Sequence, residues 1–525
     1  MAGEPLSRLG VPSAASRSGR RWALRGALGI TVGLGLVVVG VSSASASGAP
    51  SPGRTAGGGH PAASVQSPLG DLTTYGYGNS RTNDDTINPA VTSVSVHPAW
   101  NKTLDGAVYG QPLVYGTSVY VGTESDTVYA LGARKGTVLW RVQTGRAVPL
   151  SVVDSAPTLS SGCGDIDPLG ITGTPVIDPP LHEIFFAEET EAGGATWRHV
   201  QHWLVALSLR THRELWHRRV DPPHPNSAST YYVAAEQQRP ALTLWKGRVY
   251  IEYGGLDGDC GQYHGYVVSL PATGRGALRS YRVPTQREGG IWGVSGAFVS
   301  AAGDLYVNTG NGSSNSLRDF DEGNSVIELS PSLRRLGYWA PRNWVTLNDD
   351  DWDLGSTGPV PVPGTSLLFA TGKPDGSGSQ GYLMAVRPLR GIGRGAYTGA
   401  VCPGGGSWGG LATAVVGSGT AAKTYVFAPC TNGTEALLVR SKAPISFHRV
   451  WGASTGSPSG SPLVSGRMVW AVNYNSGGLF GMSIATGKVV VERSTDSLPH
   501  FATPAIGDKM LVIPTSSGVE AFSAR

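Results

Sequence analysis

The fold of this chain is decided by residues 119–140, which hold three short apolar segments separated by turns. They read Val119-Tyr-Val-Gly-Thr123, Thr127-Val-Tyr-Ala-Leu131 and Thr137-Val-Leu-Trp140, with a turn at Lys135-Gly136 before the last segment. Short strands joined by glycine-bearing turns are typical of an antiparallel meander. The stretch therefore predicts one small sheet of a larger β-structure.

The middle strand of this unit recurs along the chain, which gives eight copies in all. The others are Leu204-Val-Ala-Leu207, Val267-Val-Ser-Leu270, Val326-Ile-Glu-Leu329, Leu383-Met-Ala-Val386, and the weaker Leu437-Leu-Val439, Met482-Ser-Ile484 and Val519-Glu-Ala-Phe522. A unit of four short strands cannot bury both of its faces alone, and radial stacking of such units solves that problem. The sequence predicts an all-β, eight-bladed β-propeller, with an array of two or three β-sandwiches as the alternative.

The last unit, Phe501 to Phe522, lacks a fourth strand of its own. The segment Val94-Ser-Val-His-Pro-Ala-Trp100 is predicted to supply it, so that strands from the two ends of the chain close the ring. An aromatic residue marks the outer strand of several units, and Trp100 fits the same place in this segment. The others are Trp140, Trp216, Tyr281, Trp339 and Trp451.

Composition excludes several classes of protein. The chain has 525 residues, among them 14 Trp, and its 75 Gly and 36 Pro are too many helix breakers for a long helical protein. Its Gly follows no three-residue period, so it is not collagen. The balance of 41 basic and 37 acidic residues leaves a net charge of +4, which argues against a nucleic-acid partner. No phosphate-binding loop or hydrolase nucleophile motif occurs.

The N-terminus has the parts of a secretory signal. Arg17, Arg20, Arg21 and Arg25 precede the apolar run Gly26–Val41, and the small-residue stretch Ser42–Ala46 follows it. Cleavage and retention as an anchor both stay open. We predict a signal peptide or N-terminal anchor over 1–46, a Gly/Ser/Pro linker over 47–68 and the propeller over 69–525. Export would place the protein in the cell envelope or outside it, with a membrane met only through an uncleaved N-terminus.

The four cysteines are predicted to form disulfides, because export favours an oxidising compartment. Four cysteines allow three pairings. Cys402 and Cys430 flank one Gly-rich strand segment, so we pair them and leave Cys163 with Cys260.

The phrase Tyr129-Ala-Leu-Gly-Ala-Arg-Lys-Gly-Thr-Val-Leu-Trp140 resembles the repeat of pyrroloquinoline quinone (PQQ) propellers, and Tyr75–Asn83 resembles the opening of such domains. That family has eight blades locked together by tryptophans, which agrees with the count of repeats. The repeat also serves non-catalytic propellers, including a scaffold of outer-membrane assembly. The resemblance therefore fixes fold better than function.

Four further segments resemble the quinoprotein alcohol dehydrogenases. They are Gly289-Gly-Ile-Trp292, Thr309-Gly-Asn-Gly312, Asp349-Asp-Asp-Trp-Asp353 and Lys373-Pro-Asp-Gly376. The resemblance implies that Trp292 stacks under the quinone and that Lys373 lies close to it. It also implies that Asn311 and Asp353 bind calcium and that Asp353 is the catalytic base. Carboxylate and amide oxygens are the ligands that calcium prefers.

The sequence also departs from that family. A calcium-binding Glu is expected just before Gly265, but the stretch reads Asp257-Gly-Asp-Cys-Gly-Gln-Tyr-His264. Either Asp259 substitutes as the metal ligand with a shorter reach, or Cys260 occupies the position and leaves the calcium short of a ligand. The family's adjacent pair of cysteines is missing, and without a haem motif a separate electron acceptor is required. Arg239 and His264 border predicted inner strands, Gln238–Leu242 and Gly265–Val268, and are further candidates for binding the cofactor in the central funnel.

Two functions follow from these observations. The leading hypothesis is an exported binding or scaffold module with a partly degenerate quinone and calcium site, whose partner is a protein, a glycan or a small molecule. The alternative is a PQQ- and calcium-dependent dehydrogenase of an alcohol or sugar.

Overall fold

The structure is a computed structural model that describes residues 70–92, 95–157, 159, 162–194, 196–223, 231–376, 378–456 and 458–524. The predicted signal or anchor and the linker lie outside these residues. Within the described part of the chain, no helix has both the length and the apolar character needed to cross a bilayer.

The described residues form eight antiparallel sheets of four main strands each. The first four blades are β3–β6 (Leu113–Tyr115, Ser118–Gly122, Thr127–Gly132, Val138–Gln143), β7–β10 (Val176–Asp178, Glu183–Glu191, Val200–Ser208, Glu214–Arg219), β12–β15 (Thr243–Trp245, Arg248–Gly255, Tyr266–Pro271, Arg279–Arg282) and β16–β19 (Phe298–Val299, Leu305–Asn308, Val326–Leu329, Arg335–Ala340). Two short strands extend this half, with β11 (Glu236–Gln237) pairing with β13 and β23 (Gly391–Ile392) pairing with β19.

The second half of the chain repeats the arrangement. Its blades are β20, β21, β22 and β24 (Val360–Val362, Leu367–Thr371, Gly378–Ala385, Ala396–Pro403), β25–β28 (Ala412–Val416, Lys423–Cys430, Gly433–Arg440, Ser446–Ala453), β29–β32 (Leu463–Ser465, Met468–Asn473, Gly478–Ser483, Val489–Ser494) and β33–β35 (Ala505–Gly507, Met510–Thr515, Gly518–Ala524) with β2 (Val96–Thr103). The helices are short: α1 Leu150–Val153, α2 Tyr231–Ala235, α3 Trp344–Asp349, and the 3-10 turns η1 Tyr75–Tyr77, η2 Trp197–His199, η3 Leu354–Ser356 and η4 Gly419–Ala421.

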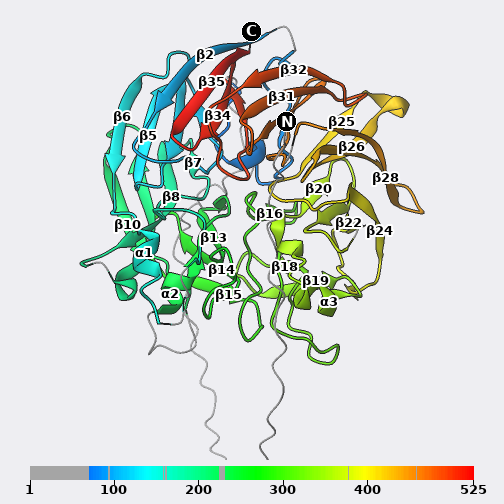
Figure 1. Ribbon diagram of the computed structural model, residues 1–525, viewed down its shortest axis with the longest axis horizontal. Helices are drawn as coiled ribbons and strands as arrows, with labels where there is room; N and C mark the ends of the chain where they lie inside the picture. The colour runs from blue at the N-terminus through cyan, green and yellow to red at the C-terminus, as the bar shows by residue number, and fades with distance from the viewer. Residues whose placement is uncertain are drawn as a thin grey trace, which may run out of the picture. The chain divides into compact units, whose positions relative to one another are not determined.

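The two ends of the propeller close the ring. Strand β2 pairs antiparallel with β35 from Val96 opposite Ala524 to Thr103 opposite Gly518, and Figure 1 shows the blue and red strands side by side. The predicted eight-bladed propeller and its closure by the segment around Trp100 are confirmed. The β-sandwich array is wrong, because every sheet packs between two neighbours of its own kind.

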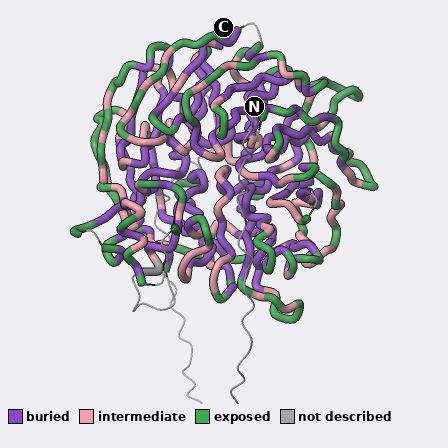
Figure 2. The backbone as a smooth tube through the Cα atoms, viewed as in Figure 1, coloured by how far each residue is buried: buried purple, intermediate pink, exposed green. Residues whose placement is uncertain are grey.

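Burial explains the order of strands within a blade. The third strand of the first blade, β5, is buried along almost its whole length, whereas the outer strand β6 alternates between exposed and half-buried residues. Figure 2 shows the same contrast around the ring, with buried backbone inside and exposed backbone at the rim. Continuous apolar runs therefore form the middle strands, and alternating sequences form the edges.

Tryptophans of the outer strands lock neighbouring blades together. The Trp100 indole Nε1 donates to the Ala133 carbonyl (2.8 Å) and packs against Gly136. In the same way Trp451 donates to the Ile484 carbonyl (3.0 Å) and packs against Gly487. Each of these glycines has a positive φ and lies directly under the indole, so the turn needs glycine for both reasons.

We predict that Gly487→Ala destabilises the propeller more than Gly364→Ala does. A Cβ at Gly487 would lie 2.6 Å from Trp451 at φ +70°, whereas one at Gly364 would meet nothing within 4 Å at φ +72°. Both substitutions strain the backbone by about 1–2 kcal/mol, and only Gly487→Ala adds a steric clash of about 1–3 kcal/mol. Urea denaturation followed by tryptophan fluorescence measures the difference. Equal losses in the two variants would contradict indole docking as a source of stability.

The connections between strands divide the propeller into two faces. In the first blade Ser118 pairs with Gly132, so the turn before β4 and the turn after β5 lie at the same end of the sheet. We call the end formed by these turns in every blade the hairpin face. The loops between second and third strands and the links from one blade to the next form the opposite end, which we call the loop face.

The segment 70–85 fills the axis of the ring. Asp71 lies at the hairpin face, where its carboxylate accepts from the Gly116 N–H (2.8 Å). The chain then runs up to η1 and returns, with Asp84 and Asp85 pairing parallel to β29. Arg81 is 1% exposed and donates to carbonyls and hydroxyls of two blades and of the segment itself, at Ala297, Leu242, Thr243, Thr74 and Tyr75. Burial lowers the pKa of Arg81 to about 10.

Candidate functional site

A cavity of about 150 Å³ opens at the loop face. Its aromatic walls are Trp292, Trp408 and Phe501, which come from three different links between blades and are each half-buried. The Trp292 and Phe501 rings lie 6.2 Å apart at 45°. Two cations border these rings, with Lys373 5.7 Å from the Trp292 ring and Arg239 5.5 Å from the Phe501 ring. These rings and cations suit a flat anion, and the same cavity is also lined by five acids: Asp165, Asp257, Asp259, Asp351 and Asp353.

Asp353 is the buried acid of this cavity, with 3% of its surface exposed. One carboxylate oxygen accepts a short hydrogen bond from the Asn311 backbone N–H, and the other pairs with Lys373 Nζ at 3.0 Å. Glycines make this crowding feasible, because a Cβ at Gly310 would lie 2.6 Å from the Asp353 carboxylate and one at Gly372 only 2.1 Å from its carbonyl oxygen. Three loops therefore converge on a single carboxylate.

Asp259 lies beside this carboxylate and is held by two neighbours. It accepts a short hydrogen bond from the Tyr263 hydroxyl and a longer one, 3.4 Å, from the Asn311 side-chain amide. Burial and the charge of Asp353 raise the pKa of Asp259. Asn311 thus touches both acids, through its backbone at Asp353 and its side chain at Asp259. Among the described residues, no three or more His, Cys, Asp and Glu side chains are placed to hold a metal ion, so any such site would depend on Asn311 as well.

Lys373 neutralises only part of this charge. Its ammonium bridges Asp353 and the exposed Asp351, at 2.6 Å from the latter. Although burial alone would lower it, these two carboxylates hold the pKa of Lys373 above its ordinary value. Burial and the Asp353 charge raise the pKa of Asp351 to about 6. Asp259, Asp351 and Asp353 thus outnumber the one ammonium that lies among them.

Both predicted disulfides are present. Cys402 pairs with Cys430, and Cys163 pairs with Cys260 across a Cα–Cα distance of 6.0 Å. The second bridge ties together the loops that bring Asp165 and Asp257 to the rim of the cavity. Asp165 and Asp257 therefore lie at one site, together with Asp259.

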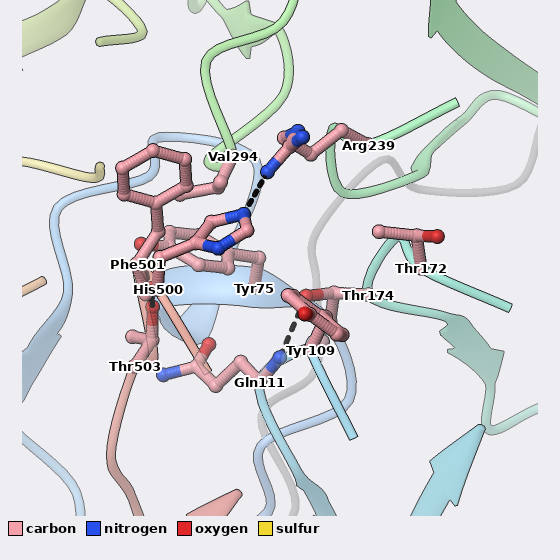
Figure 3. Close-up of a pocket in the computed structure, with 11 residues that line it drawn as sticks. Tyr75, Tyr109, Gln111, Thr172, Thr174, Arg239, Val294, His500, Phe501 and Thr503 are labelled. Atoms are coloured by element: carbon pink, nitrogen blue, oxygen red, sulfur yellow. Dashed lines mark hydrogen bonds between the residues drawn. The ribbon is translucent and has the colours of Figure 1, made fainter. Parts of the chain in front are cut away.

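Arg239 belongs to this cavity and also to a small pocket of about 10 Å³, enough for one water molecule (Figure 3). It donates a short hydrogen bond to His500 Nε2 and lies 3.3 Å from an Asp165 carboxylate oxygen. Burial and the Arg239 charge lower the pKa of His500 to about 3, so this histidine is a neutral acceptor. Figure 3 shows the His500 ring pointing toward the guanidinium.

His264 does not line the cavity. Its backbone N–H donates to the buried Glu236 carboxylate (3.0 Å), and its ring meets Tyr266 edge-on at 6.2 Å. The two inner strands predicted around Arg239 and His264 are wrong. Residues 238–242 form a link that contains Pro240, which cannot donate to a ladder, and Gly265–Val268 falls largely in the third strand of its blade.

The sequence did not predict three aromatic residues of the cavity: Tyr263, Trp408 and Phe501. Trp408 is the only large side chain in the glycine-rich stretch 403–410, which is a signal that could have been used. Phe501 gives no such signal. It has a φ of +63°, a conformation that bulky residues rarely adopt and that recurs at binding sites.

Buried acids near the loop face predict a stability that falls as pH rises. Burial raises the pKa of Glu124 to about 8, although its carboxylate accepts from the Gly170 N–H (2.7 Å) and the Thr172 hydroxyl (3.1 Å). The folded state therefore binds a proton that the unfolded state releases above its ordinary pKa, and this stability is lost as pH rises through about 8. We expect the free energy of unfolding to fall by about 2 kcal/mol or more between pH 5 and pH 8.

The check is urea denaturation at both pH values for the wild type, Glu124→Gln and the control Glu492→Gln at an exposed position of β32. Glu124→Gln should flatten the dependence on pH, whereas the control should keep it. If the free energy of unfolding of Glu124→Gln depended on pH as strongly as that of the wild type, Glu124 would not be the source of that dependence.

Comparison with known proteins agrees with this architecture. Residues 90–254 match a PQQ-type family described as outer membrane protein assembly factor BamB. The chain is 25% identical over 257 residues to the polyvinylalcohol dehydrogenase of Sphingopyxis sp. (strain 113P3) and 24% identical over 253 residues to that of a Pseudomonas species. The chain is a PQQ-like β-propeller.

The match covers only a third of the length of each of these two relatives, and 44% and 43% of the PQQ-like propeller chain. Solved structures extend the likeness in fold over most of the chain. The quinohemoprotein alcohol dehydrogenase ADHIIG from Pseudomonas putida HK5 gives a TM-score of 0.61 at 14% identity, covering 87% of this chain and 80% of its own. A europium-containing methanol dehydrogenase gives 0.60 at 16% (86% and 91%), and BamB from Moraxella catarrhalis gives 0.52 at 14% (82% and 100%).

Proposed function

We propose that the loop-face cavity binds PQQ and that the protein is an exported dehydrogenase of alcohols. The observation that carries the proposal is the convergence of Trp292, Asn311, Asp353 and Lys373, which are distant in sequence, around one cavity. An arrangement in which Asp353 and Asn311 lay far apart would have argued against it, because both must touch one ion or its immediate neighbours.

The residues present fit the quinone. PQQ is a flat polyanion, and the cavity offers the faces of Trp292 and Trp408 with Lys373 and Arg239 at its border. Neutral His500 accepts from Arg239 without offsetting its charge, whereas Asp165, 3.3 Å from the guanidinium, offsets part of it. PQQ, when bound, would accept the hydride equivalent that leaves the alcohol carbon.

Asp353 is the residue that takes the alcohol proton in this proposal. Its carboxylate is fixed from two sides, by the Asn311 N–H and by Lys373, and it borders the open cavity. A carboxylate held in this way is oriented toward the cavity, where it can take a proton from substrate. Lys373 thereby positions the base and flanks the quinone site at the same time.

Calcium fits the acid pair through Asn311, Asp353 and Asp259. Two carboxylates and one amide supply fewer oxygens than the six to eight that calcium takes, so the quinone and water would complete its shell. Burial first, and then the charge of Asp353, raise the pKa of Asp259, and a divalent cation between the two acids would relieve their repulsion. Asp259 would serve where the quinoprotein dehydrogenases carry Glu.

Both curated relatives are polyvinylalcohol dehydrogenases, so secondary alcohols, including short polyvinyl alcohol, are the first substrates to test. The apolar run and small-residue site of the N-terminal 46 residues support export to the cell envelope, and the BamB likeness supports the same compartment. All four cysteines are used in disulfides, so an external acceptor must remove the electrons.

A second candidate is a scaffold or binding module. The matched BamB family covers residues 90–254, which hold the first two blades and part of the third but neither Asn311 nor Asp353. In that case the cavity would bind a segment of a protein or glycan partner, and PQQ would have no effect.

Titration of the protein with PQQ separates the two candidates. We expect a calcium-dependent rise in melting temperature, since a ligand that binds only the folded state stabilises it by mass action. The rise should disappear in Trp292→Ala and persist in the control Trp245→Ala, a half-buried tryptophan of β12 outside the cavity. No rise at a large excess of PQQ would favour the scaffold.

A further inference from the structure

The hairpin face is strongly basic. The described turns between third and fourth strands contain no Asp or Glu, yet they carry Arg134, Lys135, Arg210, Arg213, Arg275, Arg334, Arg387, Arg390, Arg394, Lys442 and Lys488. All of these residues are exposed. The turns between first and second strands add Lys246, Arg467 and Lys509. The only ion pairs that offset this charge join Arg134 to Asp508 and Arg387 to Asp304 and Glu328, within the described residues.

The loop face has the opposite charge. Its exposed acids include Asp165, Asp167, Asp257, Asp319, Asp349, Asp350 and Asp351, of which Asp165, Asp257 and Asp351 line the cavity, and they outnumber the exposed arginines of its loops, Arg146, Arg198, Arg318 and Arg342. The net charge of +4 therefore conceals a molecule with one basic and one acidic face. Fixed charge of one sign spread over a face attracts a surface of the other sign over a distance of about 10 Å.

One further feature of the hairpin face fits a membrane. Leu181 stands in the turn between β7 and β8, on this face, with 56% of its surface exposed. A lipid surface is the partner that suits both an exposed leucine and dispersed cations.

We propose that the hairpin face docks on an anionic lipid surface, with the loop-face cavity turned away from the bilayer. The basic side chains stand on the turns of seven blades and are therefore spread around the ring, which suits a flat and diffuse anion such as a layer of phosphatidylglycerol headgroups. The site would then receive its ligands from solution. This inference does not depend on whether the cavity binds PQQ.

The test is flotation of the full chain with vesicles of phosphatidylcholine alone and with about 30% phosphatidylglycerol. We expect at least tenfold more binding to the anionic vesicles at about 50 mM salt, and loss of that difference at about 500 mM salt. Comparison of the two compositions separates charge from insertion of the N-terminal apolar run, which neutral vesicles also allow.

Two matched pairs of substitutions test which face of the propeller binds the vesicles. Arg210→Glu with Arg394→Glu reverses two charges of the hairpin face, and Arg146→Glu with Arg318→Glu reverses two at the loop face, so both change net charge equally. The first pair should reduce binding to anionic vesicles at least tenfold and the second should not, with melting curves confirming that both fold. Equal loss in the two pairs, equal binding to both vesicles, or stronger binding to short duplex DNA than to anionic vesicles would overturn the proposal.

Discussion

Replacing Asp353 by Asn is expected to lower kcat for alcohol oxidation by about a hundredfold to ten-thousandfold, because a general base contributes that much to such a step. Asn has the same shape and can still accept the hydrogen bond from the Asn311 N–H, but it cannot take a proton or pair with Lys373. PQQ-loaded protein assayed with an artificial electron acceptor gives the rate. The shift in melting temperature with PQQ shows whether the quinone still binds.

Asp350→Asn is the control for this prediction. Asp350 stands in the same acidic run, is exposed and does not line the cavity, so its variant should keep the wild-type rate. Turnover within threefold of wild type in Asp353→Asn would show that another group removes the proton. Absence of turnover in the wild-type protein, despite PQQ binding, would instead separate binding from catalysis.

Replacing Arg81 by Met is expected to lower the free energy of unfolding by about 3–5 kcal/mol, the range for removing one member of a buried charged network. Met fills the space of the side chain stem but leaves the Ala297 and Leu242 carbonyls without their donor. It also leaves Glu252 without the cation that helps to hold its pKa down, although burial already raises that pKa to about 7. Chemical denaturation followed by tryptophan fluorescence measures the loss.

Arg318→Met removes the same charge from an exposed loop and should change stability by less than about 0.5 kcal/mol. If the two variants unfolded at the same denaturant concentration, the hydrogen bonds of Arg81 in the axial segment would not contribute to the stability of the propeller. Loss of PQQ binding in Arg81→Met without loss of stability would also contradict the prediction, because it would show that Arg81 contributes to ligand binding and not to folding.

The fold could be predicted because each blade repeats one local pattern. The apolar residues of segments such as Val267-Val-Ser-Leu270 predict that these strands are buried, as they are in the structure. The spacing of the turns predicts how many strands each blade has. The closure by β2 was also accessible, since the last unit was one strand short. What could not be read locally was the path of residues 70–85, because their partners lie in several different blades.

Cavity residues could be predicted where they belong to a short recognisable motif, and could not be predicted where distant loops bring them together. Trp292, Asn311, Asp353 and Lys373 each lie in a recognisable segment, and they do lie around one cavity. Arg239 also borders it, although its local structure was predicted wrongly. Phe501 and Tyr263 reach the cavity only because distant loops fold over it, and His264 turns into its own blade through contact with Tyr266. Such placements depend on packing between blades, which one segment does not encode.

The pairing of β2 with β35 has a consequence for how the protein is made. A ribosome makes β2 more than 400 residues before β35, so β2 lacks this partner and the ring stays open until β35 has been made. An open ring presents unpaired strand edges, which are templates for aggregation. A chain that stalls before β35, or that loses this strand afterwards, would keep those edges. Synthesis through the seven-residue strand Gly518–Ala524 is thus a condition for a closed ring.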